Sequence, residues 1–431
     1  MSKSDSNLAR NLKSRHILMM ALGGTIGAGI FQGSSSSIHI AGPSVLITYL
    51  IGGLILLVVM RGLAAIALRY PQATTIKGLI EPILGPFAGY VAGWIYWLDW
   101  VLVMAAETAA ASTFLQYWFP SVPLWVLALL VAIAMTLLNL TPVRIFGETE
   151  YWLAAVKIVT LSLFIIFGAI VLATRYSGRQ ISHNLVGHGG FFPHGIDGVA
   201  AAMLVVMFSF GGIEMIGMTL GETENPEQTI PRAARNVIVR ILLFYLLPIA
   251  VIVCLIPWSQ VGGTQSPFVT VFSQIGIPYV GGIMNFVMLT AVLSAINTGM
   301  YATSRMLYTQ AMDGFVPKLF RKTNQHNVPV TSLLFSTLFL YVGVAVAFFA
   351  GSNTFNDLMV IPGYTVMMVW MLLLVSQWRN TGAKPTTILA LAALVAIFIA
   401  VIVTSAVAGT IVSFGCVAVI AISYLFTRAK S

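Results

Sequence analysis

Two glycine-rich stretches interrupt apolar segments of this sequence and are well suited to bind a ligand. Residues 23–33 read GGTIGAGIFQG, and residues 208–217 read FSFGGIEMIG. Glycine inside a helix costs roughly 1 kcal/mol relative to alanine, so each stretch favours a break in its helix. Inside a membrane, the backbone groups that a break frees are tolerated only where they line a cavity or meet a ligand. Freed N–H groups at a half-helix N-terminus suit a carboxylate, and freed carbonyls suit an ammonium group. A ligand that carries both groups is an amino acid.

Backbone atoms of the two stretches are therefore the predicted ligands of this zwitterion. We expect its carboxylate to lie against the backbone of residues 27–29, and its ammonium group against carbonyls near residue 26 and in residues 208–211. The alternative is close helix packing, because glycines four residues apart also match the small-residue pattern of membrane helices. The predicted substrate-binding residues are Thr25, Ile26, Gly27, Ala28, Gly29, Phe208, Ser209, Phe210 and Gly211.

Lys157 is the most informative single charge, because no other charged residue occurs in residues 151–173. An ionisable residue inside a membrane span is a functional candidate by default. The alternative is snorkelling, since about 10 Å of depth is within reach of a lysine stem.

Three acidic residues also lie within apolar segments. Glu214 could titrate during a transport cycle, or could serve only as a structural hydrogen-bond acceptor, whereas Glu107 is a candidate with no specific predicted role. Asp99 lies in the stretch YWLDW, where an acid near the pocket could favour a ligand with a cationic side chain. Asp99 could equally pair with a basic residue or accept a tryptophan N–H.

The elements that position these residues are predicted to be membrane-spanning helices. The chain has 431 residues, of which 58% are hydrophobic and 8% are charged, whereas soluble domains carry about 25% charged residues. A span needs about 20 apolar residues. The sequence predicts an all-α integral membrane protein with twelve spans, at 16–38, 43–67, 86–117, 122–140, 150–174, 197–221, 237–257, 280–311, 330–350, 354–377, 386–404 and 407–427.

The distribution of basic residues predicts the orientation. Of the 22 Lys and Arg residues, only Arg175 and Arg179 fall in predicted outer loops when the N-terminus is inside, and Lys157 falls within a span. Cytoplasmic loops are the ones enriched in Lys and Arg. We therefore expect a multi-pass protein of the cell membrane with both termini in the cytoplasm. Its net charge of +9 is explained without nucleic acid as a partner, and its neighbours are lipids.

The two breaks lie five spans apart, in the first and sixth spans, so the helices that contain them cross in opposite directions. Paired glycine-interrupted segments in two halves of a chain indicate a transport site near the membrane midplane. The predicted organisation is an inverted repeat followed by two further helices. Its parts are an N-terminal tail at 1–15, a first repeat at 16–175, an outer loop at 176–196, a second repeat at 197–377, and the last two helices with a short tail at 378–431.

Several motifs together resemble those of one transporter family. GGTIGAGIFQGSS, GWIYWLDWVLVMAAET, FGETEYWLAAVKI, FSFGGIEMIGMTLGETENPEQTIPRA and LSAINTGMYATSRMLY look like the amino acid transporter branch of the amino acid–polyamine–organocation superfamily. The resemblance covers nearly the whole chain. It implies a LeuT-like fold of five plus five inverted helices with discontinuous helices 1 and 6, alternating access, and proton-driven amino acid uptake.

The resemblance also implies roles for single residues. The first aromatic residue of the second motif, Phe208, is expected to close over the substrate as a gate. An ammonium group can replace the cation that sodium-coupled relatives bind between helices 1, 5 and 8. Lys157 is therefore expected to load and release the proton beside Ser294, Thr298 and the Gly23 carbonyl. In the loop GETENPEQTIPRA, Glu222, Glu224 and Arg232 are expected to form a cytoplasmic ion-pair network, the alternative being a solvated loop.

One stretch departs from the family pattern. After the second predicted span the sequence reads MRGLAAIALRYPQATTIKG, and Ala65 occupies the place where the family usually has an acidic residue. Arg61 therefore lacks a local acidic partner, which affects the expected inner gate and leaves the two breaks untouched.

These observations predict a secondary transporter, a proton symporter that imports a neutral L-amino acid. The alternatives are an amino acid exchanger, a carrier of a cationic amino acid that uses Asp99, and a receptor that binds without transport. An enzyme is not expected, because the spans contain no nucleophile–base pair. We expect no metal and no cofactor, with the proton and not sodium as the coupling ion.

Overall fold

The structure is a computed structural model, and it describes residues 19, 24–71, 73, 75–141, 143–214, 242–261, 266–275, 280–325, 328–350, 354–404 and 407–428. All regular secondary structure in these ranges is helical. The α-helices are α2 (Ala28–Phe31), α3 (Gly33–Ala41), α4 (Val45–Arg69), α5 (Ile76–Leu84), α6 (Pro86–Gln116), α7 (Leu124–Asn139), α8 (Val143–Arg175), α9 (Gly178–Val186), α10 (Gly195–Phe210), Leu242–Leu255, α13 (Pro267–Ile275), α14 (Val280–Met312), α15 (Val330–Ala350), α16 (Thr354–Thr381), α17 (Pro385–Thr404) and α18 (Val407–Arg428). Short 3-10 helices are η1 (Gly42–Ser44), η3 (Trp258–Gln260) and η4 (Lys318–Arg321).

Eight helical segments in the described ranges are long and apolar enough to cross a membrane. They are Gly33–Arg69, Pro86–Gln116, Gly147–Arg175, Gly281–Met312, Val330–Phe349, Phe355–Thr381, Pro385–Thr404 and Val407–Thr427. Three shorter apolar helices, Leu124–Asn139, Gly195–Phe210 and Leu242–Leu255, fall where the sequence predicts further spans. The all-helical, multi-span class is therefore confirmed, while the count of twelve spans stays a prediction.

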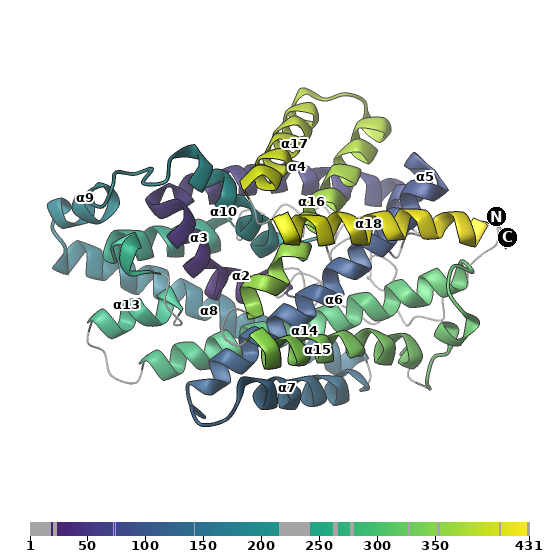
Figure 1. Ribbon diagram of the computed structural model, residues 1–431, viewed down its shortest axis with the longest axis horizontal. Helices are drawn as coiled ribbons and strands as arrows, with labels where there is room; N and C mark the ends of the chain where they lie inside the picture. Colours follow the sequence, from purple (N-terminus) through teal and green to yellow (C-terminus); the bar gives the residue numbers. More distant parts are fainter. Residues whose placement is uncertain are drawn as a thin grey trace.

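The boundary between the first two predicted spans coincides with η1. Gly42 there has a φ of 63°, a conformation that glycine adopts without strain. A side chain at this position would also collide with Pro193, since a Cβ would lie 2.3 Å from its Cγ. The chain changes direction at this point, so α3 and α4 run at an angle to each other (Figure 1).

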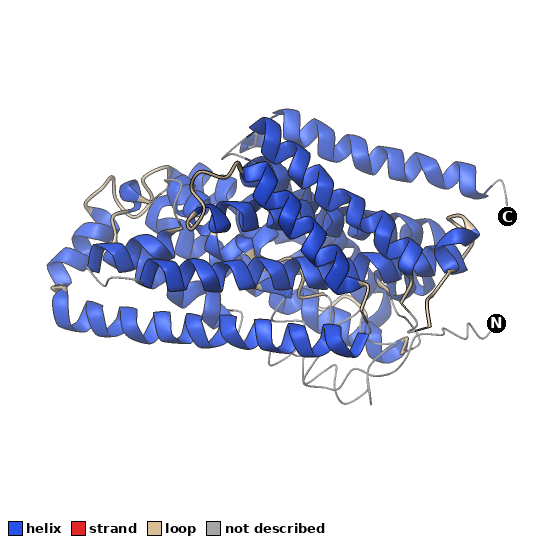
Figure 2. Ribbon diagram, turned by 90° about the horizontal axis from the view of Figure 1, so that it is seen from below, coloured by secondary structure: helices blue, strands red, loops and turns tan. Residues whose placement is uncertain are grey.

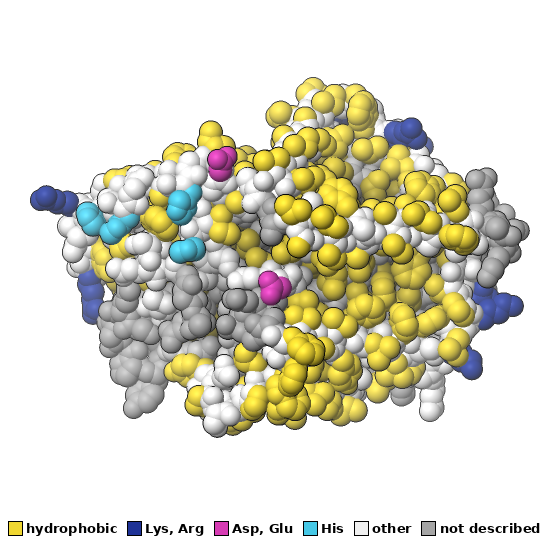
Figure 3. Space-filling view, in the orientation of Figure 1, with side chains coloured by type: hydrophobic (Ala, Val, Ile, Leu, Met, Phe, Trp, Pro, Cys, Tyr) yellow, Lys and Arg dark blue, Asp and Glu magenta, His cyan; other side chains and the backbone are white. Residues whose placement is uncertain are grey.

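Several long helices, among them α14, α15 and α18, run along the longest axis of the molecule, whereas α16 and α17 are inclined to it (Figure 1). Hydrophobic side chains cover the middle of the face in Figure 3, whereas Lys and Arg side chains gather toward the two ends of that axis. This separation matches a membrane protein whose long axis lies across the bilayer, because charged side chains are costly within hydrocarbon.

Helices α6 and α14 form the centre of the bundle. The apolar window of α14 is 78% buried and that of α6 is 67% buried, whereas the window of α18 is only 6% buried. Helix α18 lies at the edge of the bundle in Figure 2, with its side chains directed to the surroundings. Residues of α6 and α14 are therefore the best placed to hold chemistry away from lipid.

Candidate substrate site

The two predicted breaks lie against each other in the centre of the molecule. The chain bends at residues 26–27 before α2 begins, and α10 ends at Phe210 and is followed by a turn at residues 211–214. A Cβ on Gly29 would lie 2.6 Å from the Ser209 Cα. A Cβ on Gly212, whose φ is +98°, would lie 2.6 Å from the Gly24 carbonyl oxygen. Glycine is thus required on both sides, because backbone meets backbone at these points.

A tyrosine hydroxyl joins the two breaks. The hydroxyl oxygen of Tyr245, on the helix Leu242–Leu255, lies 2.6 Å from the Thr25 carbonyl oxygen and 2.6 Å from the Ser209 carbonyl oxygen. Both carbonyls belong to the groups that the sequence predicts as ammonium ligands. Because one hydroxyl has one proton, it can donate to only one carbonyl at a time. Tyr245 was not predicted, although a tyrosine within an apolar span is a signal for such a contact.

Glu107 caps the N-terminus of α2. Its two carboxylate oxygens each lie 3.0 Å from the Ala28 nitrogen, and a Cβ on Gly27 would lie 2.4 Å from its Oε1. A negative charge is stabilised at a helix N-terminus. The sequence singled out Glu107 without a role, and the structure places its carboxylate on one of the N–H groups expected to receive the substrate.

A small cavity lies between the breaks and α6. Its volume is about 20 Å³, little more than the 10–15 Å³ that about one water molecule needs. Its lining comprises Gly24, Thr25, Gly29, Asp99, Trp100, Val103, Glu107, Phe208, Ser209, Gly211 and Gly212. A substrate can enter this site only if the surrounding helices or side chains move.

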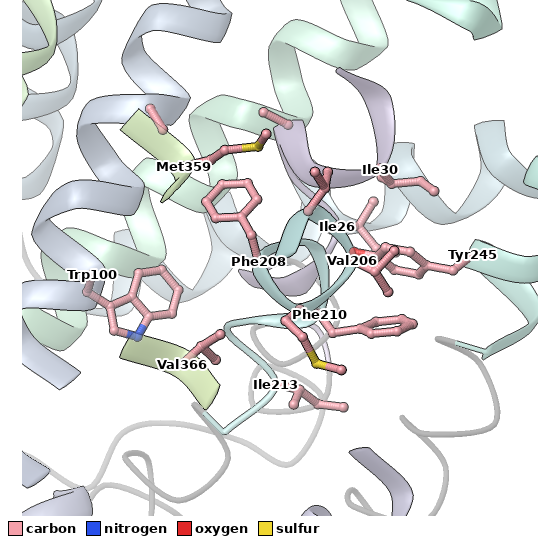
Figure 4. Close-up of a cluster of buried hydrophobic side chains, with 14 of the residues drawn as sticks. Ile26, Ile30, Trp100, Val206, Phe208, Phe210, Ile213, Tyr245, Met359 and Val366 are labelled. Carbon is pink, nitrogen blue, oxygen red and sulfur yellow. The ribbon is translucent and has the colours of Figure 1, made fainter. Parts of the chain in front are cut away.

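Aromatic residues set the shape of this cavity. Figure 4 shows Phe208 and Phe210 pointing to opposite sides of the end of α10. Phe208 lines the cavity and contacts Phe355, with ring centroids 5.7 Å apart. Phe210 is fully buried against Tyr49 and Tyr245, at centroid distances of 5.8 Å and 4.9 Å. Phe210 therefore packs in the core, whereas Phe208 lies in the cavity wall, and its role as a gate stays a prediction.

The remaining predicted substrate residues divide in the same way. Thr25, Gly29, Ser209 and Gly211 line the cavity, whereas the Ile26 side chain is fully buried in the hydrophobic core. Burial of an isoleucine side chain contributes roughly 1.5–3 kcal/mol to folding.

Asp99 lies in the cavity wall, buried to 2% exposure. The Thr365 hydroxyl on α16 donates a hydrogen bond of 2.8 Å to its Oδ1. Glu214 lies apart from the cavity lining, where its carboxylate accepts from the Gly212 N–H at 3.2 Å and from the Trp370 indole N–H at 3.5 Å. The contacts of Glu214 hold the turn that follows α10.

Lys157 is fully buried between α8 and α14, so its amine does not reach the membrane surface. Its Nζ donates a 2.8 Å hydrogen bond to the Ser294 Oγ, as the sequence predicts. Thr298 turns its methyl group toward the first break, since a Cβ on Gly24 would lie 3.0 Å from the Thr298 Cγ2. Gly23, Glu222, Glu224 and Arg232 lie outside the described residues.

Glu150 is a buried acid that the sequence reasoning missed. Its carboxylate accepts hydrogen bonds from Ser294 and from the Asn297 Nδ2, the latter at 3.2 Å. It lies seven residues before Lys157, which places both on one face of α8. This spacing was the available signal, but the predicted span began at residue 150, which hid the acid at its boundary.

Lys77 forms one ion pair that joins α5 to the residue after α14, and a second within α5. Its Nζ contacts Asp313 and lies 3.2 Å from the Glu81 Oε2. The amine also lies 4.6 Å from the centre of the Phe315 ring. The sequence predicted an inner ion-pair network in another loop and gave Lys77 no role beyond its positive charge.

Comparisons with known proteins agree with this geometry. The family profile described as "Amino acid permease" matches residues 16–428. The chain belongs to the amino acid permease family. Members of this family are transporters and not enzymes, so the expected class is confirmed.

Individual relatives extend the match over the whole chain. An uncharacterized amino acid permease, YvbW of Bacillus subtilis, is 48% identical over 445 aligned positions that cover 100% of both chains. The gamma-aminobutyric acid permease of the same organism is 40% identical, covering 88% of this chain and 81% of its own. The aromatic amino acid transport protein AroP of Escherichia coli O6:H1 is 40% identical, covering 88% and 83%.

A solved structure shares the fold. The crystal structure of MhsT in complex with L-phenylalanine superposes with a TM-score of 0.63 and 14% identity, covering 90% of this chain and 98% of MhsT. This permease is therefore a multi-span helical membrane protein with a LeuT-like fold.

Proposed function

We propose that this permease is a proton-coupled symporter that imports a neutral L-amino acid across the cell membrane. The observation that carries the proposal is the contact of both helix breaks around one small cavity, which is lined by glycines of both breaks. Backbone groups of this kind bind the carboxylate and the ammonium group of any amino acid.

The geometry suggests how the substrate is held. The Gly29 N–H receives the carboxylate, next to the Ala28 N–H that Glu107 already occupies, and the Thr25 and Ser209 carbonyls accept from the ammonium group. The Tyr245 hydroxyl lies 2.6 Å from each of these carbonyls and donates to one of them at a time, which keeps the two close together. Trp100 and Phe208 then limit the side chain, because both line the cavity. A relative that transports aromatic amino acids and a fold match that contains L-phenylalanine support an uncharged side chain.

Lys157 is the proposed proton carrier. Its amine is fully buried and hydrogen-bonded to Ser294 on α14, and it interacts electrostatically with Glu107, which contacts the first break. Protonation of Lys157 would thus change the electrostatic potential at the substrate site through Glu107. A change of protonation there can favour one orientation of the carrier over the other.

The wider architecture belongs to the same proposal. We infer twelve spans, with two five-helix repeats of opposite orientation, at 16–175 and 197–377, and with both termini in the cytoplasm. The LeuT-like fold match and the paired breaks support this arrangement. The two repeats would then move against each other around a fixed midplane site.

A cationic amino acid is the second candidate substrate, favoured by one observation. Asp99 lines the cavity and is almost fully buried. A carboxylate in a substrate cavity can pair with a basic side chain. The hydrogen bond from Thr365 supplies part of its stabilisation when the substrate is neutral.

Uptake into proteoliposomes tests the proposal. Labelled neutral, cationic and acidic amino acids are offered with and without an inward proton gradient. We expect accumulation of one neutral group above equilibrium only with the gradient, and its loss in Lys157→Met. The same change at the exposed Lys318 is the control and keeps uptake. Uptake that requires preloaded amino acid and ignores the gradient would show exchange in place of symport.

A further inference from the structure

A chain of buried polar residues leads from Lys157 toward one end of the bundle. The Lys157 Nζ donates to the Ser294 Oγ at 2.8 Å, and the Ser294 hydroxyl donates to the Glu150 Oε1. The Asn297 Nδ2 donates to the Glu150 Oε2 at 3.2 Å, and the Asn139 Nδ2 donates to the Asn297 Oδ1 at 3.0 Å. The exposure of these residues is 9% or less. Five polar side chains thus form one continuous path through an apolar interior.

The path ends at a small cavity with both polar and apolar walls. Asn139 lines a small cavity together with Thr141, Ser304 and Arg305, among other residues. Its volume is about 10 Å³, which suits about one water molecule. The Arg305 guanidinium donates to the Ser304 hydroxyl at 3.3 Å and lies over the Tyr301 ring at 3.7 Å. This end of α8 is the one that begins at Val143, which the proposed orientation places in the cytoplasm.

Two carboxylates act on Lys157 from opposite sides. Glu150 and Glu107 are the carboxylates that act electrostatically on Lys157, one toward the Val143 end of α8 and one at the first break. Ser294, Asn297 and Thr298 of α14 are the polar groups that face Glu150. A serine hydroxyl can accept one proton while it gives up another, so Ser294 can connect Lys157 to Glu150. Asparagine amides donate hydrogen bonds and orient the carboxylate.

We propose that Glu150 takes up the proton that Lys157 releases and delivers it toward the cytoplasmic end of the bundle. In this step the Lys157 ammonium passes a proton to the Ser294 oxygen while the Ser294 hydroxyl proton moves to the Glu150 carboxylate. The result is a neutral amine and a neutral carboxyl group, with the serine unchanged. Glu150 then gives its proton to water that enters from the cytoplasmic end of the bundle, while the Asn297 and Asn139 amides orient the carboxylate and carry no proton. The inference rests on the proposed proton symport and adds its exit route.

Net uptake and counterflow separate this role from a purely structural one. Net symport requires proton release on the inside in every cycle, whereas exchange of internal for external substrate at equal, mildly acidic pH does not. We expect Glu150→Gln to lower gradient-driven uptake at least about tenfold, a smaller loss than the roughly 100- to 10,000-fold that proton transfer by a positioned side chain contributes to catalysis. Counterflow should stay within about twofold of the wild-type rate, because the substrate site is untouched. Glu150→Asp, which keeps a titratable carboxyl group, should restore part of the net uptake.

A matched control is Glu148→Gln. Glu148 is a half-buried acid on the same helix, and two residues of separation place it about 200° away around the helix axis. This substitution should leave both net uptake and counterflow at their wild-type rates. Asn297→Ala is the second variant: it cuts the link between Glu150 and Asn139 while Glu150 keeps its Ser294 contact. It should also slow net uptake more than counterflow.

The outcomes are distinguishable. The relay would be overturned if Glu150→Gln and Asn297→Ala lost net uptake and counterflow equally, and if Glu150→Asp restored neither rate. That result would show a structural role. Unchanged net uptake in Glu150→Gln would overturn it as well. If wild-type protein shows counterflow but no response to a proton gradient, the symport proposal fails first and the relay with it.

Discussion

Substituting Gly29 by alanine tests the claim that the two breaks must touch. The added Cβ would lie 2.6 Å from the Ser209 Cα, 2.8 Å from its Oγ and 2.9 Å from its Cβ. Carbon atoms pack best at about 3.5–4.0 Å, so α2 and α10 must separate by about 1 Å. Backbone atoms on the Ser209 side cannot rotate away, so the strain has no easy relief.

The added methyl group overpacks this contact, which should destabilise the state in which the two breaks touch by about 1–3 kcal/mol. The carrier can relieve this strain without substrate by separating the breaks, but the strain returns when both breaks close on the substrate. At about 1.4 kcal/mol per factor of ten, substrate affinity should fall about 5- to 140-fold. Maximal exchange should change less than affinity.

The assay is substrate counterflow at a series of concentrations, with thermal stabilisation by substrate in detergent as a second readout. Gly415→Ala is the matched control, because a Cβ added at this position on α18 would have no atom within 4 Å of it. It should leave affinity unchanged and keep the fold. An unchanged affinity in Gly29→Ala, or an equal loss in Gly415→Ala, would refute the argument from close contact.

Three further changes probe the same site. Tyr245→Phe removes the hydroxyl that lies 2.6 Å from two carbonyls. Because a hydrogen bond contributes about 0.5–1.5 kcal/mol, the substrate concentration at half-maximal uptake should rise about 2- to 12-fold. An unchanged value would show that Tyr245 does not support the site. Asp99→Asn keeps an acceptor for the 2.8 Å hydrogen bond from Thr365, so uptake of a neutral substrate should stay within about threefold of the wild-type rate. A loss of uptake confined to basic amino acids would establish the cationic alternative. Gly212→Ala and Gly382→Ala both place alanine at a positive φ, of +98° and +82°, so each should lower the free energy of unfolding by about 1–3 kcal/mol. Only Gly212→Ala should abolish uptake, because its Cβ would meet the Gly24 oxygen. Equal uptake by the two variants would argue against this contact.

Much of the fold could be read from hydrophobic runs, because a membrane imposes one pattern on every span. The eight long apolar segments all fall within or across predicted spans. The interval between the predicted spans 16–38 and 43–67 contains the start of η1, and the two glycine stretches predicted breaks that do lie in contact. The pairing of Lys157 with Ser294 also followed from the sequence, through the family resemblance.

Other parts of the site depend on which helices become neighbours, and a span list does not contain that information. Glu107 reaches Ala28 across 79 residues of sequence, and Tyr245 reaches Thr25 across 220. Phe208 and Phe210 look equivalent in the motif, yet a two-residue offset on a helix directs them to opposite sides. Glu150 was missed because the predicted start of the span at residue 150 hid a buried acid at the boundary.

Proton movement measured together with substrate entry tests the central claim most directly. Proteoliposomes that contain a pH-sensitive dye receive external amino acid at equal pH on both sides, with the membrane potential clamped at zero. We predict that the interior becomes acidic as the amino acid enters, and that this acidification disappears in Lys157→Met while counterflow persists. Entry of the amino acid with no change of internal pH in the wild-type protein would contradict proton symport.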